Sequence, residues 1–198
     1  LPSKLIKRLS EKTVQLIMSM EEPIIWEIPG RRAPDNIRRL SKILSRDSVY
    51  LEAATHPLIL DALEGILGPN IELLTNKHNH LMIRPPKSYA VPWHSGEETY
   101  NPVLFTALIY LEESTIENGC IRIVPGSHQR PLNSTHFSSE MCFSSNPLYH
   151  RALPIPMPRG GILLFDDRLY HGADINRSQR SRRSMTIAYR THDAHNII

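Results

Sequence analysis

Residues 103–111 read VLFTALIYL, a nearly continuous run of apolar side chains that predicts a β-strand. From Ile71 onward, other short apolar segments are separated by Pro, Gly and Asn, which is typical of a mainly β architecture. Further strands are expected at residues 71–84, 120–124, 162–165 and 185–190, with turns at Asn118-Gly119, Pro125-Gly126 and Gly160-Gly161. Strands of this length and spacing predict a sandwich or jelly roll.

The region before Ile71 has a helical rather than a β pattern. Apolar residues recur near helical spacing in three segments, and we expect helices that form an outer layer over a sheet. The three patterns are Leu5, Leu9, Leu16 and Met20; Ile37, Leu40, Ile43 and Leu44, after Asp35 as a possible N-cap; and Leu60, Leu63 and Leu67, between a Thr55 or His56 cap with Pro57 and a stop at Gly68-Pro69. We therefore predict a mostly helical layer at residues 1–70 and a jelly-roll core at residues 71–198, with a long loop near residues 133–158.

Bulk composition limits the class of protein. The 198 residues are 40% apolar and 22% charged, which suits a single globular domain over residues 1–198. No apolar run reaches the roughly 18 residues of a membrane span, so we expect a soluble, cytoplasmic protein without a membrane partner. The net charge of +3 comes without a dense basic tract, so no nucleic-acid polymer is expected as a partner. Cys120 and Cys142 are interpreted as free thiols, and the oligomeric state stays open.

A small group of residues carries the chemical signal. His94-Ser95-Gly96 is followed much later by His171 and then by Arg182. Non-haem iron oxygenases hold Fe(II) with two histidines and one carboxylate. The carboxylate usually stands two residues after the first histidine, where this chain has Gly96. Either the iron site is inactive, or an anion from outside the chain fills the position.

Several motifs together resemble the phytanoyl-CoA dioxygenase superfamily, over roughly residues 58–190. They are Trp93-His94-Ser95-Gly96, Leu111-Glu112-Glu113, Asn118-Gly119-Cys120-Ile121-Arg122, Pro125-Gly126-Ser127-His128, and His171-Gly172 through Asn176-Arg177-Ser178 to Arg182-Arg183. The resemblance implies a double-stranded β-helix, the cupin-like jelly roll, with flanking helices. It also implies the cofactors Fe(II) and 2-oxoglutarate, with O2 as oxidant.

The resemblance also assigns roles to individual residues. His94 and His171 resemble the two iron ligands, and Arg182 resembles the arginine that pairs with the far carboxylate of 2-oxoglutarate, with Arg180 and Arg183 as close competitors. A planar guanidinium matches a carboxylate, which lysine does not. The cluster of Arg177, Arg180, Arg182 and Arg183 is equally compatible with a solvated loop. Period-two alternation places His78, His80 and Met82 on one face of a strand, and His80, Thr106 and Leu108 are predicted to line the cosubstrate pocket.

Gly96 departs from the hydroxylase pattern. The family subgroup with glycine or alanine at this position is similar to iron-dependent halogenases, in which chloride takes the vacated place, so we predict chloride binding at Gly96. Removing a carboxylate deletes a negative charge and opens a small void beside the cation, and chloride would restore both. Three alternatives stay open: Glu97 or Glu98 could ligate iron and restore a hydroxylase, the site could be degenerate in a non-catalytic binding protein, or an original aspartate could have been replaced.

The substrate is less well determined than the chemistry. The predicted reaction is chlorination of an unactivated C–H bond in a free small molecule, and a carrier-protein partner is not expected. The net positive charge and the arginines present in addition to Arg182 favour an anionic substrate such as a nucleoside monophosphate. Lys77, Arg84, Arg122 and Arg151 are available to bind its phosphate. A free amino acid is the alternative, with Glu97 or Glu98 binding its ammonium group.

Overall fold

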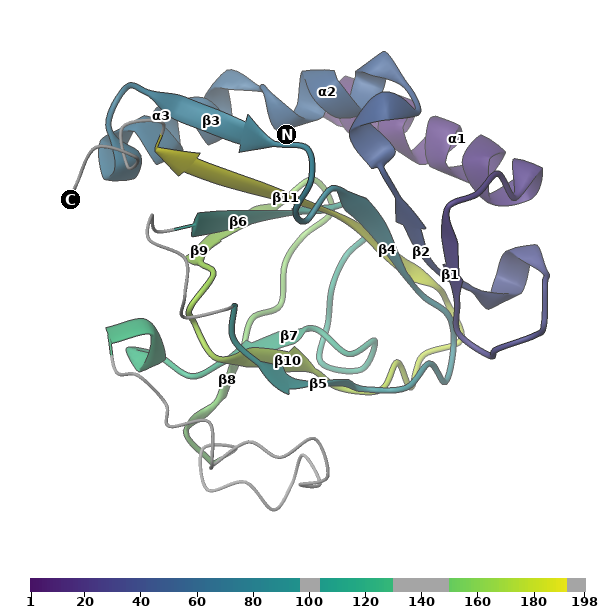
Figure 1. Cartoon of the computed structure of the whole chain (residues 1–198). Coiled ribbons are helices and arrows are strands. Elements are labelled where there is room, and N and C mark those ends of the chain that lie inside the picture. Colours follow the sequence, from purple (N-terminus) through teal and green to yellow (C-terminus); the bar gives the residue numbers. More distant parts are fainter. Residues whose placement is uncertain (97–103, 130–149, 192–198) are drawn as a thin grey trace.

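The computed structural model describes residues 1–96, 104–129 and 150–191. Two β-sheets face each other, and helices cover the outer side of the larger sheet (Figure 1). The large sheet has seven strands in the order β1-β2-β4-β11-β6-β9, with β3 paired to β11, and the small sheet has the order β5-β10-β7-β8. The predicted mainly β jelly roll with flanking helices is confirmed.

The large sheet separates the helices from the interior of the sandwich. Its strands are β1 (Ile24–Trp26), β2 (Ile37–Ser41), β3 (Ile71–Leu74), β4 (His80–Arg84), β6 (Leu104–Tyr110), β9 (Ile162–Asp166) and β11 (Arg182–Thr191). Alternate side chains of each strand point to opposite faces. On β11, Met185, Ile187 and Tyr189 belong to the core under the helices, whereas Arg182 and Ser184 line a cavity on the inner face. Because side chains alternate along β11, the polar residues of this strand face the cavity while its apolar residues face the helices.

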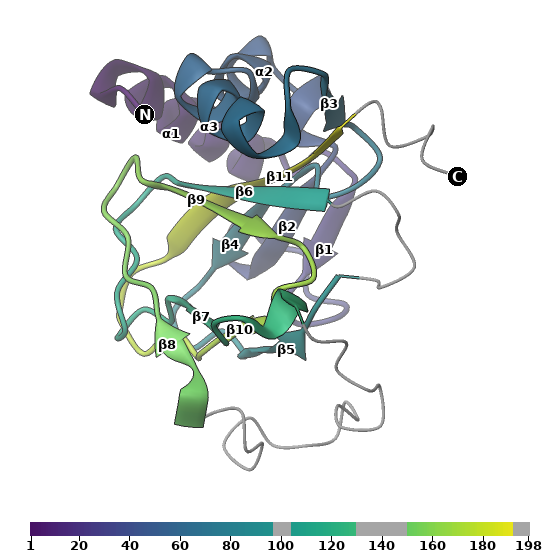
Figure 2. The same ribbon diagram turned by 90° about the vertical axis from the view of Figure 1, so that its left-hand side faces the viewer.

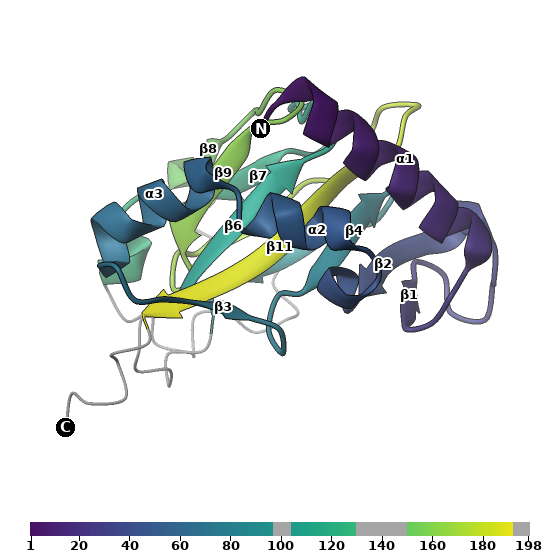
Figure 3. The same ribbon diagram turned by 90° about the horizontal axis from the view of Figure 1, so that it is seen from above.

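Three α-helices pack across the outer face of the large sheet (Figure 3). They are α1 (Ser3–Ser19), α2 (Ser48–Ala54) and α3 (Pro57–Leu67). The first and third match the predicted helices: Leu5, Leu9 and Leu16 of α1 are buried, and His56 caps α3 by accepting from Leu58 N. Met20, which the predicted helical face included, instead follows the end of α1 in a left-handed conformation and is exposed. Helix α2 was not predicted; its N-cap is Asp47, whose side chain accepts from Val49 N.

The predicted second helix is wrong. Residues 37–41 form strand β2, between short 3-10 turns at Pro34–Asn36 and Ile43–Ser45. Ile37, Leu40 and Ile43 are fully buried at a spacing of three, which imitates a helical face. Pairing of β2 with β1 and β4 satisfies the backbone in the extended form. Strands therefore enter the predicted helical layer.

The single strand predicted at residues 71–84 is interrupted. Both β3 and β4 pair with β11, Leu74 opposite Ala188 and His80 opposite Thr186, so residues 75–79 bulge out between them. His78 adopts φ +48° in this excursion. Residues 75–79 therefore leave the sheet, and this places His78 Nε2 3.1 Å from Asp167 Oδ1.

The small sheet consists of β5 (Val91–His94), β7 (Ile121–Ile123), β8 (Leu153–Pro154) and β10 (His171–Ala173) (Figure 2). Of these, only β7 was predicted. Gly119, Gly126 and Gly160, at the predicted turns, all have positive φ. Most of the predicted loop at residues 133–158, together with Cys142, lies outside the described residues.

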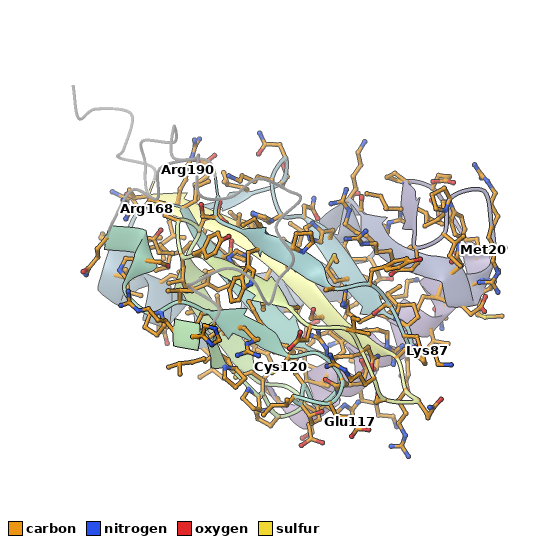
Figure 4. The ribbon with its side chains drawn as sticks, turned by 90° about the horizontal axis from the view of Figure 1, so that it is seen from below. Met20, Lys87, Glu117, Cys120, Arg168 and Arg190 are labelled. Atoms are coloured by element: carbon orange, nitrogen blue, oxygen red, sulfur yellow. The ribbon has the colours of Figure 1, made fainter. Side chains whose placement is uncertain are left out.

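Cys120 is a buried free thiol next to β7, labelled in Figure 4, which views the molecule from the side of the small sheet. Burial raises the pKa of its thiol, so the thiol stays protonated near neutral pH.

Among the helices in the described ranges, none has the length and apolar character to cross a bilayer.

Candidate metal and cosubstrate site

Two imidazoles meet where β5 and β10 pair. His94 lies opposite His171 in the register, and their ring centroids are 4.2 Å apart. In each ring Nδ1 lies close to a backbone carbonyl, at 2.8 Å from Pro92 O for His94 and 2.7 Å from Leu169 O for His171. A carbonyl can only accept, so Nδ1 carries the proton and Nε2 keeps its lone pair. This is the tautomer and the orientation that a metal-binding histidine needs.

The surroundings of His171 favour its neutral form. Burial is the main cause that lowers its pKa to about 4, and the nearby His94 lowers it further. The edge of Phe165 packs against the ring at a centroid distance of 5.0 Å. A neutral imidazole at pH 7 is available to bind a cation without first losing a proton.

A cavity of about 270 Å³ lies on the inner face of the large sheet and reaches both histidines. The residues predicted to line the cosubstrate pocket, His80, Thr106, Leu108 and Arg182, all belong to its wall. Burial lowers the pKa of His80 to about 3, so its ring is neutral. The other lining residues are Arg39, His78, Met82, Arg84, Val91, Tyr110, Ile121, Phe165, Asp167, Gly172, Ala173, Ser184 and Thr186.

Two guanidinium groups stand side by side in this wall. Arg182 on β11 is paired in register with Arg84 on β4, and both are at most 5% exposed. Arg182 donates to the carbonyl of Gly119 at 2.9 Å, and Arg84 donates to that of Asp174 at 2.9 Å. Nε and Nη1 of Arg84 are buried without a hydrogen-bond partner among the described residues. Burial lowers the pKa of both arginines, that of Arg84 to about 10, where the charge of Arg182 also contributes.

The neighbouring arginines point elsewhere. Arg183, one residue further along β11, faces the opposite side of the sheet and pairs with Glu112. Arg180 and Arg177 are exposed in the turn before the strand. Of the four clustered arginines, only Arg182 lines the cavity. Arg84 was among the residues predicted to be available for a substrate phosphate, and period-two alternation from His80 and Met82 places it on the cavity face.

The candidate substrate-binding residues separate into three groups. Arg122 does not line the cavity, because its neighbour Ile121 faces inward; its guanidinium approaches Asp174 Oδ2 at 3.5 Å and Ala152 O at 3.3 Å. Lys77 lies next to the site but is engaged by Asp167. Glu97 and Glu98 lie outside the described residues.

Sequence reasoning missed Asp167, which is 4% exposed in the cavity wall. Its Oδ1 accepts from Thr106 Oγ1 and lies 3.1 Å from His78 Nε2, and its Oδ2 lies 3.1 Å from Lys77 Nζ. Burial alone would raise the pKa of this carboxyl, but His78 and Lys77 together hold the pKa well below its usual range. Asp167 is therefore a carboxylate at neutral pH.

Asp167 also occupies the space predicted for chloride. A Cβ placed on Gly96 would lie 2.1 Å from Asp167 Oδ2 and 2.5 Å from its Cγ. The void expected beside Gly96 is thus filled by a protein carboxylate. Only a residue without a side chain fits at position 96 while Asp167 keeps this conformation.

The donor set fits an iron(II) and 2-oxoglutarate centre. His94 and His171 each present a free Nε2, and the buried, unpaired donors of Arg84 next to Arg182 suit the carboxylates of a dianion. Across residues 1–96, 104–129 and 150–191, no three His, Cys, Asp or Glu side chains already converge closely enough to hold a metal ion. The third protein ligand is therefore not preformed in this part of the chain.

The family follows from comparison with known proteins. A family model described as phytanoyl-CoA dioxygenase (PhyH) matches residues 31–184. The chain belongs to the phytanoyl-CoA dioxygenase family. This confirms the resemblance drawn from the motifs, at the level of the family.

The relatives of this phytanoyl-CoA dioxygenase family member are distant. A probable alpha-ketoglutarate-dependent hypophosphite dioxygenase of Stutzerimonas stutzeri is 31% identical over 148 residues, which cover 69% of this chain and 51% of that protein. The human peroxisomal phytanoyl-CoA dioxygenase is 24% identical over 168 residues, 76% of this chain and 48% of that one. The chain spans about half the length of these relatives.

Solved structures support the same fold. The crystal structure of EctD from S. alaskensis with bound Fe superposes with a TM-score of 0.79 at 21% identity, and covers 96% of this chain and 69% of that one. EvdMO1 superposes with a TM-score of 0.77 at 22% identity, and covers 97% and 45%. At such identities the likeness shows the fold.

Proposed function

We propose that this chain is the catalytic part of an Fe(II)- and 2-oxoglutarate-dependent oxygenase that hydroxylates a C–H bond of a free small molecule. The observation that carries the proposal is the pair of imidazoles, His94 and His171, both fixed with Nε2 free, at one end of a cavity that also holds two buried guanidiniums. With iron(II), 2-oxoglutarate and O2 bound, such a centre supplies the oxidising power to break an unactivated C–H bond.

The chain's own residues would position the reactants. Arg182 would hold the far carboxylate of 2-oxoglutarate, where burial strengthens the ion pair because little water competes. Thr106, Leu108 and the neutral ring of His80 would form the wall along the cosubstrate. The Leu169 and Pro92 carbonyls keep the two imidazoles in the ligating tautomer.

For the substrate we propose a compact anion. Arg39 and Arg84 also line the cavity, and Asp167 is the only carboxylate among its described lining residues. A cavity of about 270 Å³ lies just below the roughly 300–1,000 Å³ of sites that hold drug-sized ligands. The cosubstrate would take part of this space, which favours an amino-acid-sized acid over a nucleoside monophosphate. The S. stutzeri relative is named for hypophosphite, itself a small anion.

Chlorination is the second candidate, and Gly96 is the observation that favours it. A halide could enter only if the Asp167 carboxylate moved away from the Gly96 backbone, because the two positions overlap. Hydroxylation needs no such displacement and is therefore the first choice. Chlorination would need chloride in addition to Fe(II), 2-oxoglutarate and O2.

The test has two stages. Anaerobic addition of Fe(II) and 2-oxoglutarate should produce a visible metal-to-ligand charge-transfer band, and oxygenation with a panel of small organic and phosphorus acids should raise succinate release for those that fit. Mass spectrometry of the product then separates one added oxygen from a chlorine isotope pair. If the protein shows no charge-transfer band and binds no Fe(II), it is a binding protein with a degenerate site and the proposal fails.

A further inference from the structure

Positions 96 and 167 share one small volume. The backbone N–H of Gly96 donates to the carbonyl of Asp167 at 2.6 Å, which fixes the two segments against each other. A Cβ on Gly96 would approach Asp167 Oδ2 to 2.1 Å, far inside van der Waals contact. While Asp167 keeps this conformation, position 96 has no room for a side chain. A carboxylate is therefore present beside the first histidine motif, but it comes from residue 167.

The Asp167 carboxylate and the two imidazoles belong to the wall of one cavity. Asp167, His94 and His171 line the same cavity, and Asp167 precedes His171 in the short connection between β9 and β10. Its backbone is held firmly, because its N–H donates to Leu104 O at 2.8 Å. A change in the direction of its carboxylate would therefore come from rotation of the side chain, with the backbone in place.

A two-histidine iron centre requires a third, anionic protein ligand, or a substitute for it. We infer that Asp167 supplies the carboxylate that position 96 lacks, so that His94, His171 and Asp167 together hold the metal. This inference rests on the proposed function. It explains why Gly96 can lack a side chain in a site that keeps both histidines and Arg182: the missing ligand is replaced from the opposite segment.

The present contacts of Asp167 show how it would reach the metal. Its Oδ1 is held by Thr106 Oγ1, with His78 Nε2 at 3.1 Å, whereas Oδ2 lies 3.1 Å from the ammonium of Lys77. A rotation of the side chain would exchange the Lys77 cation for the metal cation at Oδ2. Thr106 and His78 would then act as the outer partners that orient a ligating carboxylate.

Cobalt(II) binding tests the inference without turnover. The chain would be titrated with Co(II) in chloride-free buffer, without 2-oxoglutarate, and followed by calorimetry and by visible absorption. The variants are Asp167→Ala, the isosteric Asp167→Asn, and the exchange Gly96→Asp with Asp167→Gly. Asp166→Asn is the matched control, because the neighbouring carboxylate pairs with Arg168 at 2.7 Å and lies outside the cavity lining. Arg168 lies at the same end of the molecule as Arg190 (Figure 4).

A ligating role predicts a clear pattern. Asp167→Ala and Asp167→Asn should each weaken Co(II) binding by more than about 100-fold, since the loss of an outer partner alone costs about 10- to 100-fold. The exchange variant should recover most of the affinity, and Asp166→Asn should bind like the parent. Thermal unfolding confirms that each variant is folded.

Two results would overturn the assignment of Asp167: a smaller loss in both single variants, or a folded exchange variant that does not recover. If the parent forms its charge-transfer band with Fe(II) and 2-oxoglutarate while Asp167→Ala still binds Co(II) normally, the inference fails and the oxygenase proposal stands. If the parent binds Co(II) through Asp167 but forms no band, the oxygenase proposal fails instead.

Discussion

Replacing Arg182 by glutamine should weaken 2-oxoglutarate binding far more than it weakens the fold. Arg182 is 5% exposed, and its charge in the cavity wall is not neutralised by a carboxylate in any contact of the described residues. Removing it would leave the far carboxylate of 2-oxoglutarate buried without its partner, at a cost of about 3–5 kcal/mol. The dissociation constant should therefore rise by about two to four orders of magnitude.

The same substitution also removes hydrogen bonds to the carbonyls of Asn118 and Gly119. Hydrogen bonds from a charged donor contribute about 1.5–3 kcal/mol each, but the Asn118 contact is long at 3.4 Å. We expect a stability loss of about 2 kcal/mol, which is small enough for the variant to stay folded.

The assay is an anaerobic titration of the Fe(II)-loaded chain with 2-oxoglutarate, followed by the charge-transfer band. Arg183→Gln is the matched control, because it makes the same chemical change one residue away, on the face where Arg183 pairs with Glu112. Equal affinities of parent and Arg182→Gln, or equal losses in the two variants, would refute the assignment of Arg182.

Three further predictions concern stability. Gly96→Ala should lower the unfolding free energy by about 1–3 kcal/mol through overpacking against Asp167, and a second change, Asp167→Gly, should relieve part of this loss in a double-mutant cycle measured by urea unfolding, since the Asp167 carbonyl oxygen stays 2.9 Å from the added Cβ. Stability of the metal-free chain should fall as pH drops below 6.5, because unfolded His80 takes up a proton that the folded form, with a pKa of about 3, does not. The part due to His80 is roughly 2 kcal/mol at pH 5, so His80→Gln should have a shallower pH profile than the parent, and identical profiles would contradict the prediction. Leu9→Ala should cost about 2–5 kcal/mol because Leu9 is fully buried on the inner face of α1, whereas Met18→Ala, at a 65% exposed position of the same helix, should change the melting temperature little.

The success of sequence reasoning differed between elements for physical reasons. The helix at residues 57–67 was found because its signals are local: a capping residue, a proline in the first turn and a stop at Gly68. Strand β2 was mistaken for a helix because Ile37, Leu40 and Ile43 fit a helical face, and pairing with β1 and β4 outweighed that local pattern. The strands β5 and β10 are too short to give a pattern of their own, and they exist because they pair with each other.

The candidate site shows the same division. The family resemblance pointed to His94, His171 and Arg182 but left Arg180 and Arg183 as competitors, and only the structure separates Arg182, which faces the cavity, from Arg183, which faces outward. The position of Asp167 was beyond the sequence, because its approach to Gly96 depends on a backbone contact between segments that lie far apart in the chain. Residues 75–79 gave no local sign that Lys77 and His78 would meet that carboxylate.

The sequence by itself determined the family, the two histidines and the absence of a carboxylate at position 96, because these depend on residue identity and short spacing. Only the tertiary structure decided what fills that place. The packing of the β9–β10 connection against the end of β5 puts the Asp167 side chain there. A missing side chain can be read from a sequence, but the neighbour that occupies its volume is set by contacts between distant segments.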